Sequence, residues 1–381
     1  LSGGWGGGRI VGTLGLSFNN FSMKNIFKPE SWSPLPTGDG QKFSIRAQTN
    51  GIYYQSYNIS FTEPWLGGKK PNSLSVSGFF SMFNTTGAKK YVNDDEGNKI
   101  RNPNRSTMKI IGGSVGFGKR LKKPDDFFSI YTEASYNYYE LENYPYFILA
   151  NGYANDFNGK INITRNSVDA PIFPKNGSNF SILGQFTPPY SLFNGKNYET
   201  ATAAEKFKFI EYQKYKFTAE WFTQLTNKRA GEGKEARNLV LRTKIGYGIL
   251  GMYNSKVGVS PFERYYMGGS GLSGYQNFVA REIIALRGYT DNSLSSTSGD
   301  PLCARYTMEL RYPISLNPQA TIFVLGFAEA GNTWARYKDF NPFQVKRSAG
   351  FGLRVFLPMF GLLGLDYGWG FDPTANPSSG R

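Results

Sequence analysis

The strongest constraint on how this chain folds is an alternation of side chains that recurs in segments of about ten residues. In one segment Tyr57, Ile59 and Phe61 alternate with serine, asparagine and threonine. Similar patterns occur at 214–225, 238–247, 305–312 and 350–355, and charged side chains occupy only the polar positions. Because successive side chains of a strand point to opposite faces, the pattern predicts strands with one apolar and one polar face.

A soluble β-sandwich and a transmembrane β-barrel would both produce this alternation. Segment length favours the barrel, because residues 127–141 form one uninterrupted pattern, whereas sandwich strands usually have about five or six residues. A helical membrane protein is excluded. The richest apolar run, 355–365, is interrupted by Pro358, Gly361 and Gly364 and falls short of the ~20 residues that a spanning helix needs.

The fold class that we predict is therefore all-β, a transmembrane antiparallel barrel that uses residues 1–381 as one domain. Bacterial barrels have an even number of strands, so we expect sixteen, with about fifteen in this chain and the last one absent. The expected strands lie near 1–5, 9–19, 41–51, 53–63, 73–84, 106–118, 126–142, 159–168, 178–187, 212–226, 238–250, 303–313, 320–330, 345–357 and 362–370.

The connections between these strands alternate in length, with short turns at one end and longer loops at the other, as in outer-membrane barrels. Residues 20–40 are an exception, a long segment on the turn side. The longest connection, about 251–302, has no clear strand pattern but contains many apolar residues. A loop of this length is usually functional or disordered, and its composition indicates order. We expect it to pack inside the barrel as a plug.

Composition excludes several kinds of enzyme. The chain has no histidine and one cysteine, so imidazole metal sites, histidine-dependent catalysis, cysteine-cluster metal sites and internal disulfides are all excluded. We predict no enzymatic activity, catalytic residue, metal or cofactor, although unusual carboxylate or lysine chemistry stays open. The acidic clusters at 94–96 and 125–126 are read as solvated loops rather than calcium sites. The net charge of +15 needs no nucleic acid partner, because lumenal cations and anionic lipids account for it.

Four motifs, in order along the chain, resemble the signatures of the BamA family, whose members are central subunits of the outer-membrane β-barrel assembly machinery, and of its superfamily. They are Pro261-Phe-Glu-Arg-Tyr-Tyr-Met-Gly-Gly-Ser270, Leu286-Arg-Gly-Tyr289, Met308-Glu-Leu-Arg-Tyr-Pro313 and Phe327-Ala-Glu-Ala-Gly331. Upstream, Ile172-Phe-Pro-Lys-Asn-Gly-Ser178 is similar to the family's Phe-Pro-x-x-Gly turn. The resemblance covers essentially the whole chain. It implies periplasmic POTRA repeats before the barrel, which we expect to be absent from this chain.

The resemblance also implies a latch. In the family, an Arg-Gly-Tyr or Arg-Gly-Phe tip of the long loop is tucked into the barrel, and its arginine pairs with an acidic residue of the inner wall. Here the tip would be Arg287, Gly288 and Tyr289, and the partner would be Glu329 or Glu309. The alternative is that Arg287 lies on a solvated loop, where an ion pair contributes at most about 1 kcal/mol. A second similar sequence, Ser273-Gly-Tyr-Gln276, lacks the arginine.

The first predicted strand is rich in glycine, which offers few side chains for packing and has high backbone entropy. Such a strand should pair weakly, so its seam with the last strand would open most easily, and an open edge can capture another strand. This matches the lateral gate that the resemblance implies, although glycine could serve curvature alone. The gate strand would comprise Leu1, Gly3, Gly4, Trp5, Gly6, Gly7 and Gly8.

The function that we expect is folding and insertion of barrel proteins in the outer membrane of a Gram-negative bacterium. The expected partners are unfolded outer-membrane protein clients, accessory assembly-machinery lipoproteins, the lipid bilayer and lipopolysaccharide. A passive pore or a secretion channel of the same superfamily is the alternative. Steady conductance with the long loop in place would favour the pore.

Overall fold

The computed structural model describes residues 2–6, 9–68, 72–144, 150–227, 237–269, 280–359 and 361–374, with side chains from residue 12 onward. Fifteen strands form one antiparallel sheet and follow one another in sequence order. They are β1 (Ser2–Gly6), β2 (Arg9–Phe21), β3 (Gln41–Thr49), β4 (Tyr54–Glu63), β5 (Asn72–Asn84), β8 (Thr107–Arg120), β9 (Phe128–Glu142), β10 (Gly152–Asn166), β11 (Gly177–Phe186), β12 (Gln213–Gln224), β13 (Val240–Gly251), β16 (Leu302–Asn317), β17 (Ala320–Trp334), β18 (Lys346–Leu357) and β19 (Gly361–Gly370).

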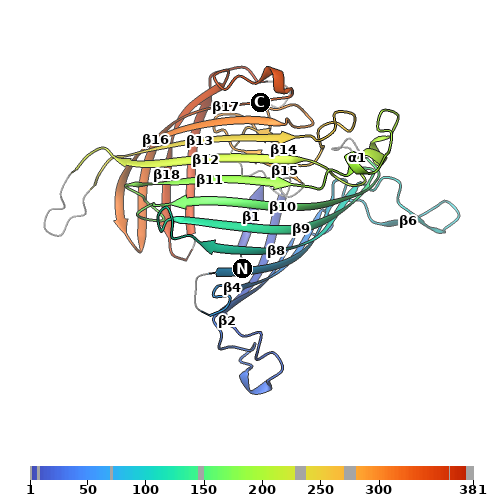
Figure 1. Cartoon of the computed structure of the whole chain (residues 1–381), viewed down its shortest axis with the longest axis horizontal. Coiled ribbons are helices and arrows are strands. Elements are labelled where there is room, and N and C mark those ends of the chain that lie inside the picture. The colour runs from blue at the N-terminus through green and yellow to red at the C-terminus, as the bar shows by residue number, and fades with distance from the viewer. Residues whose placement is uncertain are drawn as a thin grey trace.

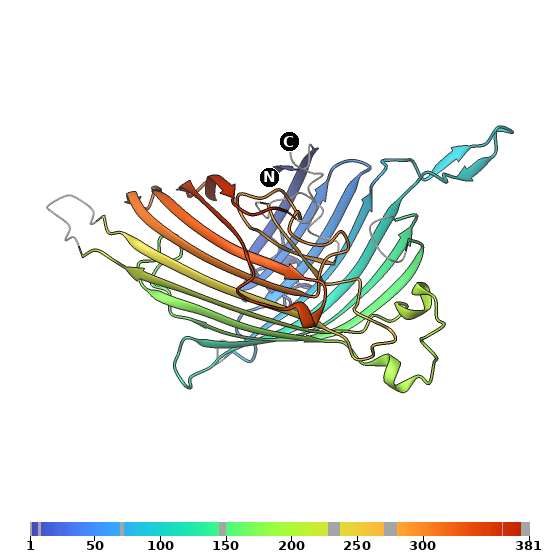
Figure 2. The ribbon, with the colours of Figure 1, turned by 90° about the horizontal axis from the view of Figure 1, so that it is seen from above.

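The sheet curls into a transmembrane barrel (Figures 1 and 2). In Figure 2 the blue N-terminal strands and the orange C-terminal strands face each other across a coil that enters from the end of β13. This coil is the predicted plug loop, residues 252–301. Among the described residues, no helix is long and apolar enough to cross a membrane.

The apolar positions of the strands form the outer face of the barrel. Leu16, Ile45 and Ile59 lie beside one another on β2, β3 and β4, and their side chains are 53, 44 and 49% exposed. In a soluble sandwich these side chains would be buried against a second sheet. The polar positions face inward, where Glu309 and Glu329 are buried. The sandwich is therefore excluded, and the outer face matches hydrocarbon.

All fifteen predicted strands are present, and three of them, β10, β16 and β17, have an end that differs from the predicted one by four residues or more. β10 begins at Gly152 rather than near 159, because its ladder with β9 continues until Gly152 pairs with Leu141. The polar residues in this stretch obscure the alternation. β16 continues past Pro313 to Asn317 through a bulge between Pro313 and Ser315, which accommodates the missing backbone N–H of proline.

The two ends of the barrel differ in their connections. At the end where the plug enters, here called the plug end, the connections are mostly long, and several contain short elements that the alternation did not predict. These are the hairpin β6 (Tyr91–Asn93) with β7 (Lys99–Arg101), the helices α1 (Tyr190–Phe193) and α2 (Ala203–Lys206), and the single turn η3 (Tyr337–Asp339). At the opposite end, here called the turn end, most connections are short, but 22–40 and 225–239 are both long.

The main core of the molecule lies between the plug and the inner wall at the plug end. Plug residues Phe262, Tyr265, Met267, Leu286 and Leu294 belong to one buried apolar cluster with side chains from the strands. The wall contributes Tyr54, Phe83, Met108, Ile110, Tyr139, Leu141, Ala154, Tyr212, Leu250 and Cys303. Burial of apolar surface thus holds the loop inside the barrel, as its composition predicted.

Candidate functional site

The plug carries the candidate site, and a short pair of strands shapes it. β14 (Arg264–Met267) pairs in parallel with β15 (Arg281–Ile284), and a further bridge joins Gly269 to Leu286. The Leu286 side chain is fully buried and is followed directly by Arg287. The predicted second copy of the motif, 273–276, lies outside the described residues. The paired strands thus present the Arg-Gly-Tyr tip to the inner wall.

Arg287 contacts both predicted carboxylates. Its Nη2 lies 2.7 Å from Glu329 Oε1 and 2.7 Å from Glu309 Oε1, and its Nε donates to Glu329 Oε1 at 3.1 Å. The backbone N–H of Arg287 donates to Glu329 Oε2 at 2.8 Å. The arginine side chain is 11% exposed, and both glutamates are buried. Both Glu329 and Glu309 are therefore partners of Arg287, and the solvated-loop alternative is wrong.

The guanidinium also lies over an aromatic ring, with its Cζ 3.7 Å from the ring centre of Phe327 on β17. This cation–π contact adds to the ion pairs in a site that water hardly reaches. Burial would lower the pKa of Arg287, but its hydrogen bond to Glu329 and that residue's charge raise it. Phe327 belongs to the motif Phe327-Ala-Glu-Ala-Gly331. Because it stands two residues before Glu329 on the same strand, the sequence places its ring on the same face as that carboxylate.

Gly288 and Tyr289 bring the tip against the last two strands. Gly288 has a φ of +89°, and a Cβ there would lie 2.6 Å from the carbonyl carbon of Trp369 and 2.9 Å from the backbone N of Gly370. The Tyr289 hydroxyl donates to the carbonyl oxygen of Arg347 at 2.7 Å. Only glycine fits this close approach with a left-handed backbone. The tip therefore touches β16, β17, β18 and β19 together.

Further charges of the inner wall surround the latch. Arg305 pairs with Glu329 at 2.8 Å, and Arg311 and Arg242 pair with Glu309 at 2.6 and 3.0 Å. Asp366 of β19 accepts from Arg354 and lies 3.5 Å from Arg287. Each latch carboxylate therefore has arginine partners besides Arg287. Sequence reasoning missed these arginines as a group, although their positions on the polar parity of β13, β16 and β18 were visible.

A second anchor, which sequence reasoning missed, holds the plug to β12. Lys214 Nζ lies 2.7 Å from Glu263 Oε2 and 2.9 Å from Glu282 Oε2. The lysine is 1% exposed, whereas most of the lysines that the structure describes are exposed. Lys216 also pairs with Glu282. Burial by itself would raise the pKa of Glu282, but the charges of Lys214 and Lys216 and their hydrogen bonds lower it to about 2.

The backbone of the plug is shaped to serve this second anchor. Glu263 has a φ of +66°, in the left-handed region that residues other than glycine rarely adopt, and its N–H donates to the carbonyl of Ala280 at 2.6 Å. Such strain persists only where the surroundings enforce it. Glu263 belongs to the Pro261–Ser270 motif, which was the one sequence signal pointing here.

The comparisons with known proteins agree with this architecture. A model of the Omp85 superfamily domain matches residues 37–380. The chain belongs to the Omp85 superfamily. Membership and the barrel fold together imply an outer-membrane protein. No curated protein sequence matches the chain.

The solved structures that resemble this Omp85 barrel include a BamA and a CdiB. BamA from Haemophilus ducreyi lacking POTRA domains 1–3 has a TM-score of 0.64 and 19% identity, covering 98% of this chain and 66% of that one. CdiB from Acinetobacter baumannii has a TM-score of 0.53 and 12% identity, covering 97% of this chain and 54% of that one. The chain thus spans under two thirds of each relative. At these identities the likeness shows the fold, and the predicted resemblance to a BamA barrel is confirmed.

The predicted gate strand lies at one edge of the Omp85 sheet. Gly3, Gly4, Trp5 and Gly6 belong to β1, which pairs with β2 from Ser2↔Thr13 to Gly6↔Arg9. Leu1, Gly7 and Gly8 lie outside the described residues. At the other edge, β19 pairs with β18 from Ser348↔Gly370 to Leu357↔Gly361.

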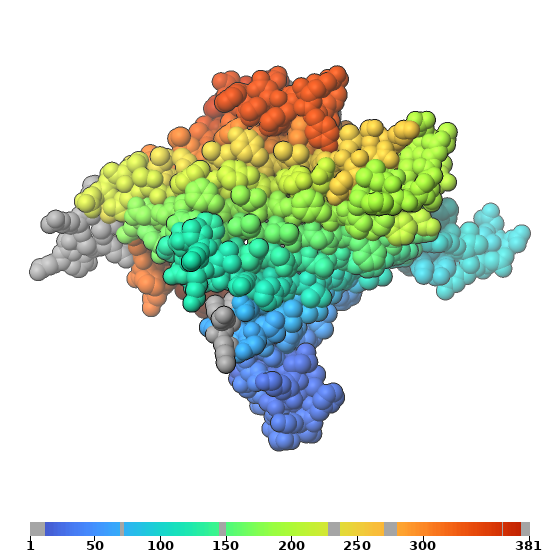
Figure 3. Space-filling view, in the orientation of Figure 1, coloured from blue at the N-terminus to red at the C-terminus, as the bar shows by residue number. Residues whose placement is uncertain are grey.

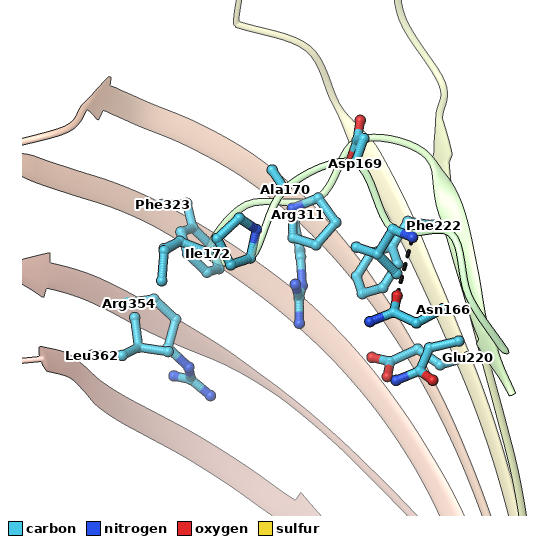
Figure 4. Close-up of a pocket in the computed structure, with 14 residues that line it drawn as sticks. Asn166, Asp169, Ala170, Ile172, Glu220, Phe222, Arg311, Phe323, Arg354 and Leu362 are labelled. Carbon is cyan, nitrogen blue, oxygen red and sulfur yellow. Dashed lines mark hydrogen bonds between the residues drawn. The ribbon is translucent and has the colours of Figure 1, made fainter. Parts of the chain in front are cut away.

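Described residues line cavities in the lumen of the Omp85 barrel. One of 490 Å³ lies beside the predicted Phe-Pro-x-x-Gly turn, and Figure 4 shows Arg311 reaching into it between Phe222 and Phe323. The Arg311 Cζ lies 5.5 and 5.6 Å from the centres of these rings. A second cavity of 400 Å³ lies along β15 of the plug. Among the described residues no cluster of three or more potential metal ligands occurs.

Proposed function

We propose that this barrel folds and inserts other β-barrel proteins in the outer membrane of a Gram-negative bacterium, through a lateral gate between its first and last strands. The observation that carries the proposal is the inequality of the two edges. At one edge, three of the five residues of β1 are glycines, which offer no side chain for cross-strand packing, whereas β19 at the other edge is touched by the latch through Gly288. The β1 edge is therefore the weaker side of the seam.

A weakly held, glycine-rich edge suits strand exchange. When β1 leaves its neighbour, it exposes unpaired backbone N–H and C=O groups that can pair with an incoming strand. The latch keeps β16–β19 together meanwhile, so one lip of the gate moves and the other stays in place. This work needs backbone hydrogen bonds and lipid disturbance but no catalytic side chain and no cofactor.

The partners in this proposal follow from the mechanism. The clients are unfolded outer-membrane proteins that present a terminal strand to the gate, and the surrounding bilayer with its lipopolysaccharide receives the folded product. Accessory lipoproteins of the assembly machinery would bind outside the barrel. The clients and the accessory lipoproteins are both proposed partners.

A disulfide lock tests the gate. Cysteine pairs scanned between β1 and β19, in a Cys303→Ser background, should abolish client insertion when oxidised, and reduction should restore it. The matched control locks β18 to β19 at Val355 and Leu363, which are already paired. Both locks are introduced into the protein in cells depleted of the wild type, and folded outer-membrane proteins are measured. Continued insertion by the β1–β19 lock would rule out the gate.

The alternative is a passive pore or a secretion channel of the same superfamily. The two lumenal cavities favour it, because a channel needs space inside the wall. The plug and its two anchors oppose it. Planar bilayer recordings separate the two functions, since a plugged insertase should show small, intermittent conductance, and a passive pore should conduct steadily.

A further inference from the structure

Residues 22–40, here called the lobe, form the long turn-end connection between β2 and β3 and contain the single turn η1 (Pro29–Ser31). Figures 1 and 3 show the lobe in dark blue, projecting from the lower edge of the barrel. Internal bonds hold it together: Ser22 Oγ donates to Asp39 at 2.6 Å, and the amide side chain of Asn25 donates to the carbonyl of Thr37 at 3.1 Å. These internal hydrogen bonds give the lobe a defined structure.

The end of β2, where the lobe begins, packs on the outer face of the barrel. The Phe21 ring stacks on Phe43 at 5.1 Å and contacts Phe61 at 6.2 Å. Phe43 and Phe61 have the same parity as the outward-facing Ile45 and Ile59. Phe21 is only 4% exposed, and Pro36 of the lobe is also buried. The lobe therefore starts from the apolar rows that face lipid.

The rest of the lobe exposes large apolar side chains next to lysines. Phe27 is 93% exposed, and Trp32 and Met23 are 46 and 45% exposed. Lys24 and Lys28 flank Phe27, and in the described part of the chain neither has an acidic side chain within ion-pair distance. Glu30 and Asp39 are the acidic residues of the lobe, and Asp39 is bound by Ser22. Aromatic side chains beside lysines are typical of the membrane interface.

We propose that the lobe is an interfacial anchor. Phe27, with Trp32 and Met23, enters the headgroup region of the leaflet at the turn end, and Lys24 and Lys28 bind phosphates of anionic phospholipids. Because the lobe begins at the lipid-facing rows of the barrel, the bilayer surface is the nearest partner. The anchor would fix β2, the strand from which β1 must separate. The proposal rests on the placement of the barrel in a membrane and is independent of the gate.

Fluorescence quenching in lipid nanodiscs tests the anchor. An environment-sensitive probe is attached at Phe27→Cys in a Cys303→Ser background and quenched by doxyl-labelled lipid or by aqueous iodide. Phe343→Cys, in the plug-end connection between β17 and β18, is the water-exposed control, since Phe343 is 88% exposed. Leu16→Cys on β2 is the membrane control, since Leu16 lies on the outer face. The discs contain phosphatidylcholine with or without phosphatidylglycerol.

We expect doxyl lipid to quench the probe at position 27, and iodide quenching there to be at least about threefold weaker than at position 343. Lys24→Glu with Lys28→Glu should increase iodide access in phosphatidylglycerol discs and change little in phosphatidylcholine alone. If position 27 behaves like 343 while position 16 is quenched by lipid, the anchor is wrong and the barrel placement stands. If position 16 also fails to meet lipid, the placement and the anchor are both wrong.

Discussion

The two anchors of the plug are opposite in charge. At the latch, the plug supplies the cation, Arg287, and the wall supplies the carboxylates of Glu309 and Glu329. At the second anchor, the wall supplies the cation, Lys214, and the plug supplies the carboxylates of Glu263 and Glu282. Both anchors use buried charges, but the consequences of removing the charged side chains of the plug differ between them.

The difference lies in what is left behind. Without Arg287, Glu329 keeps Arg305, and Glu309 keeps Arg242 and Arg311, so no wall charge is stranded. Without the two plug carboxylates, the fully buried Lys214 has lost both of its ion-pair partners. An uncompensated buried charge costs more than a lost pair. Loss of the second anchor should therefore cost more stability than loss of the latch. The latch should mainly determine where the tip of the plug lies.

The largest expected effect comes from Glu263→Gln with Glu282→Gln. The double variant leaves Lys214 without an anion and should lower the free energy of unfolding by about 3–5 kcal/mol. Denaturant unfolding of the reconstituted barrel measures it. Glu199→Gln is the control, since Glu199 and its partner Lys256 are 61 and 55% exposed, and loss of this pair should cost about 1 kcal/mol or less. Equal costs for the two variants would contradict a dominant second anchor.

Arg287→Ala should have the next largest effect, about 2–3 kcal/mol, because several charge-assisted hydrogen bonds are lost but every carboxylate keeps a partner. Arg287→Lys should recover little, since an ammonium cannot span two glutamates as the planar guanidinium does. The same unfolding experiment measures stability, and bilayer recordings should show larger conductance for both variants. Full rescue by lysine would show that charge alone matters at the latch.

Gly288→Ala separates close packing from backbone conformation. Gly258, elsewhere in the plug, has a φ of +86°, nearly equal to that of Gly288, but a Cβ there would meet nothing within 4 Å. Gly288→Ala should cost about 1–3 kcal/mol more than Gly258→Ala, because its Cβ would press on the β19 backbone. Similar costs would mean that the tip does not approach β19 this closely.

The smallest effect under ordinary conditions is the pH dependence of the second anchor. The pKa of Glu282 is lowered from 4.5 to about 2, so its stabilisation is complete above pH 4.5 and is lost as the pH falls towards 2. Unfolding curves should be unaffected by this group from pH 7 to 5. Below pH 4.5 the wild type should lose stability faster than Glu282→Gln, and parallel losses would contradict the ion pairing.

Much of the barrel could be predicted because alternation is local. The alternation was visible in short windows at β4, β12, β13, β16 and β18, and the plug was visible as a long segment rich in apolar residues. The resemblance of the motifs at 286–289, 308–313 and 327–331 to the BamA family also pointed to Arg287, Glu309 and Glu329. The pairing β14–β15 and the anchor at Lys214 were not predictable, because Lys214 and Glu282 are 68 residues apart and Lys214 resembles any other lumen-facing lysine.

The sequence by itself determined the fold class, the order of the strands and the presence of a plug, since these depend on side-chain parity and on where apolar residues occur. Only the tertiary structure decided that Arg287 binds two glutamates rather than one, that Gly288 rests against β19, and that Lys214 is buried. The physical reason is register: the curled sheet brings β12, β16, β17 and β19 around one loop, and burial there turns ordinary charges into anchors.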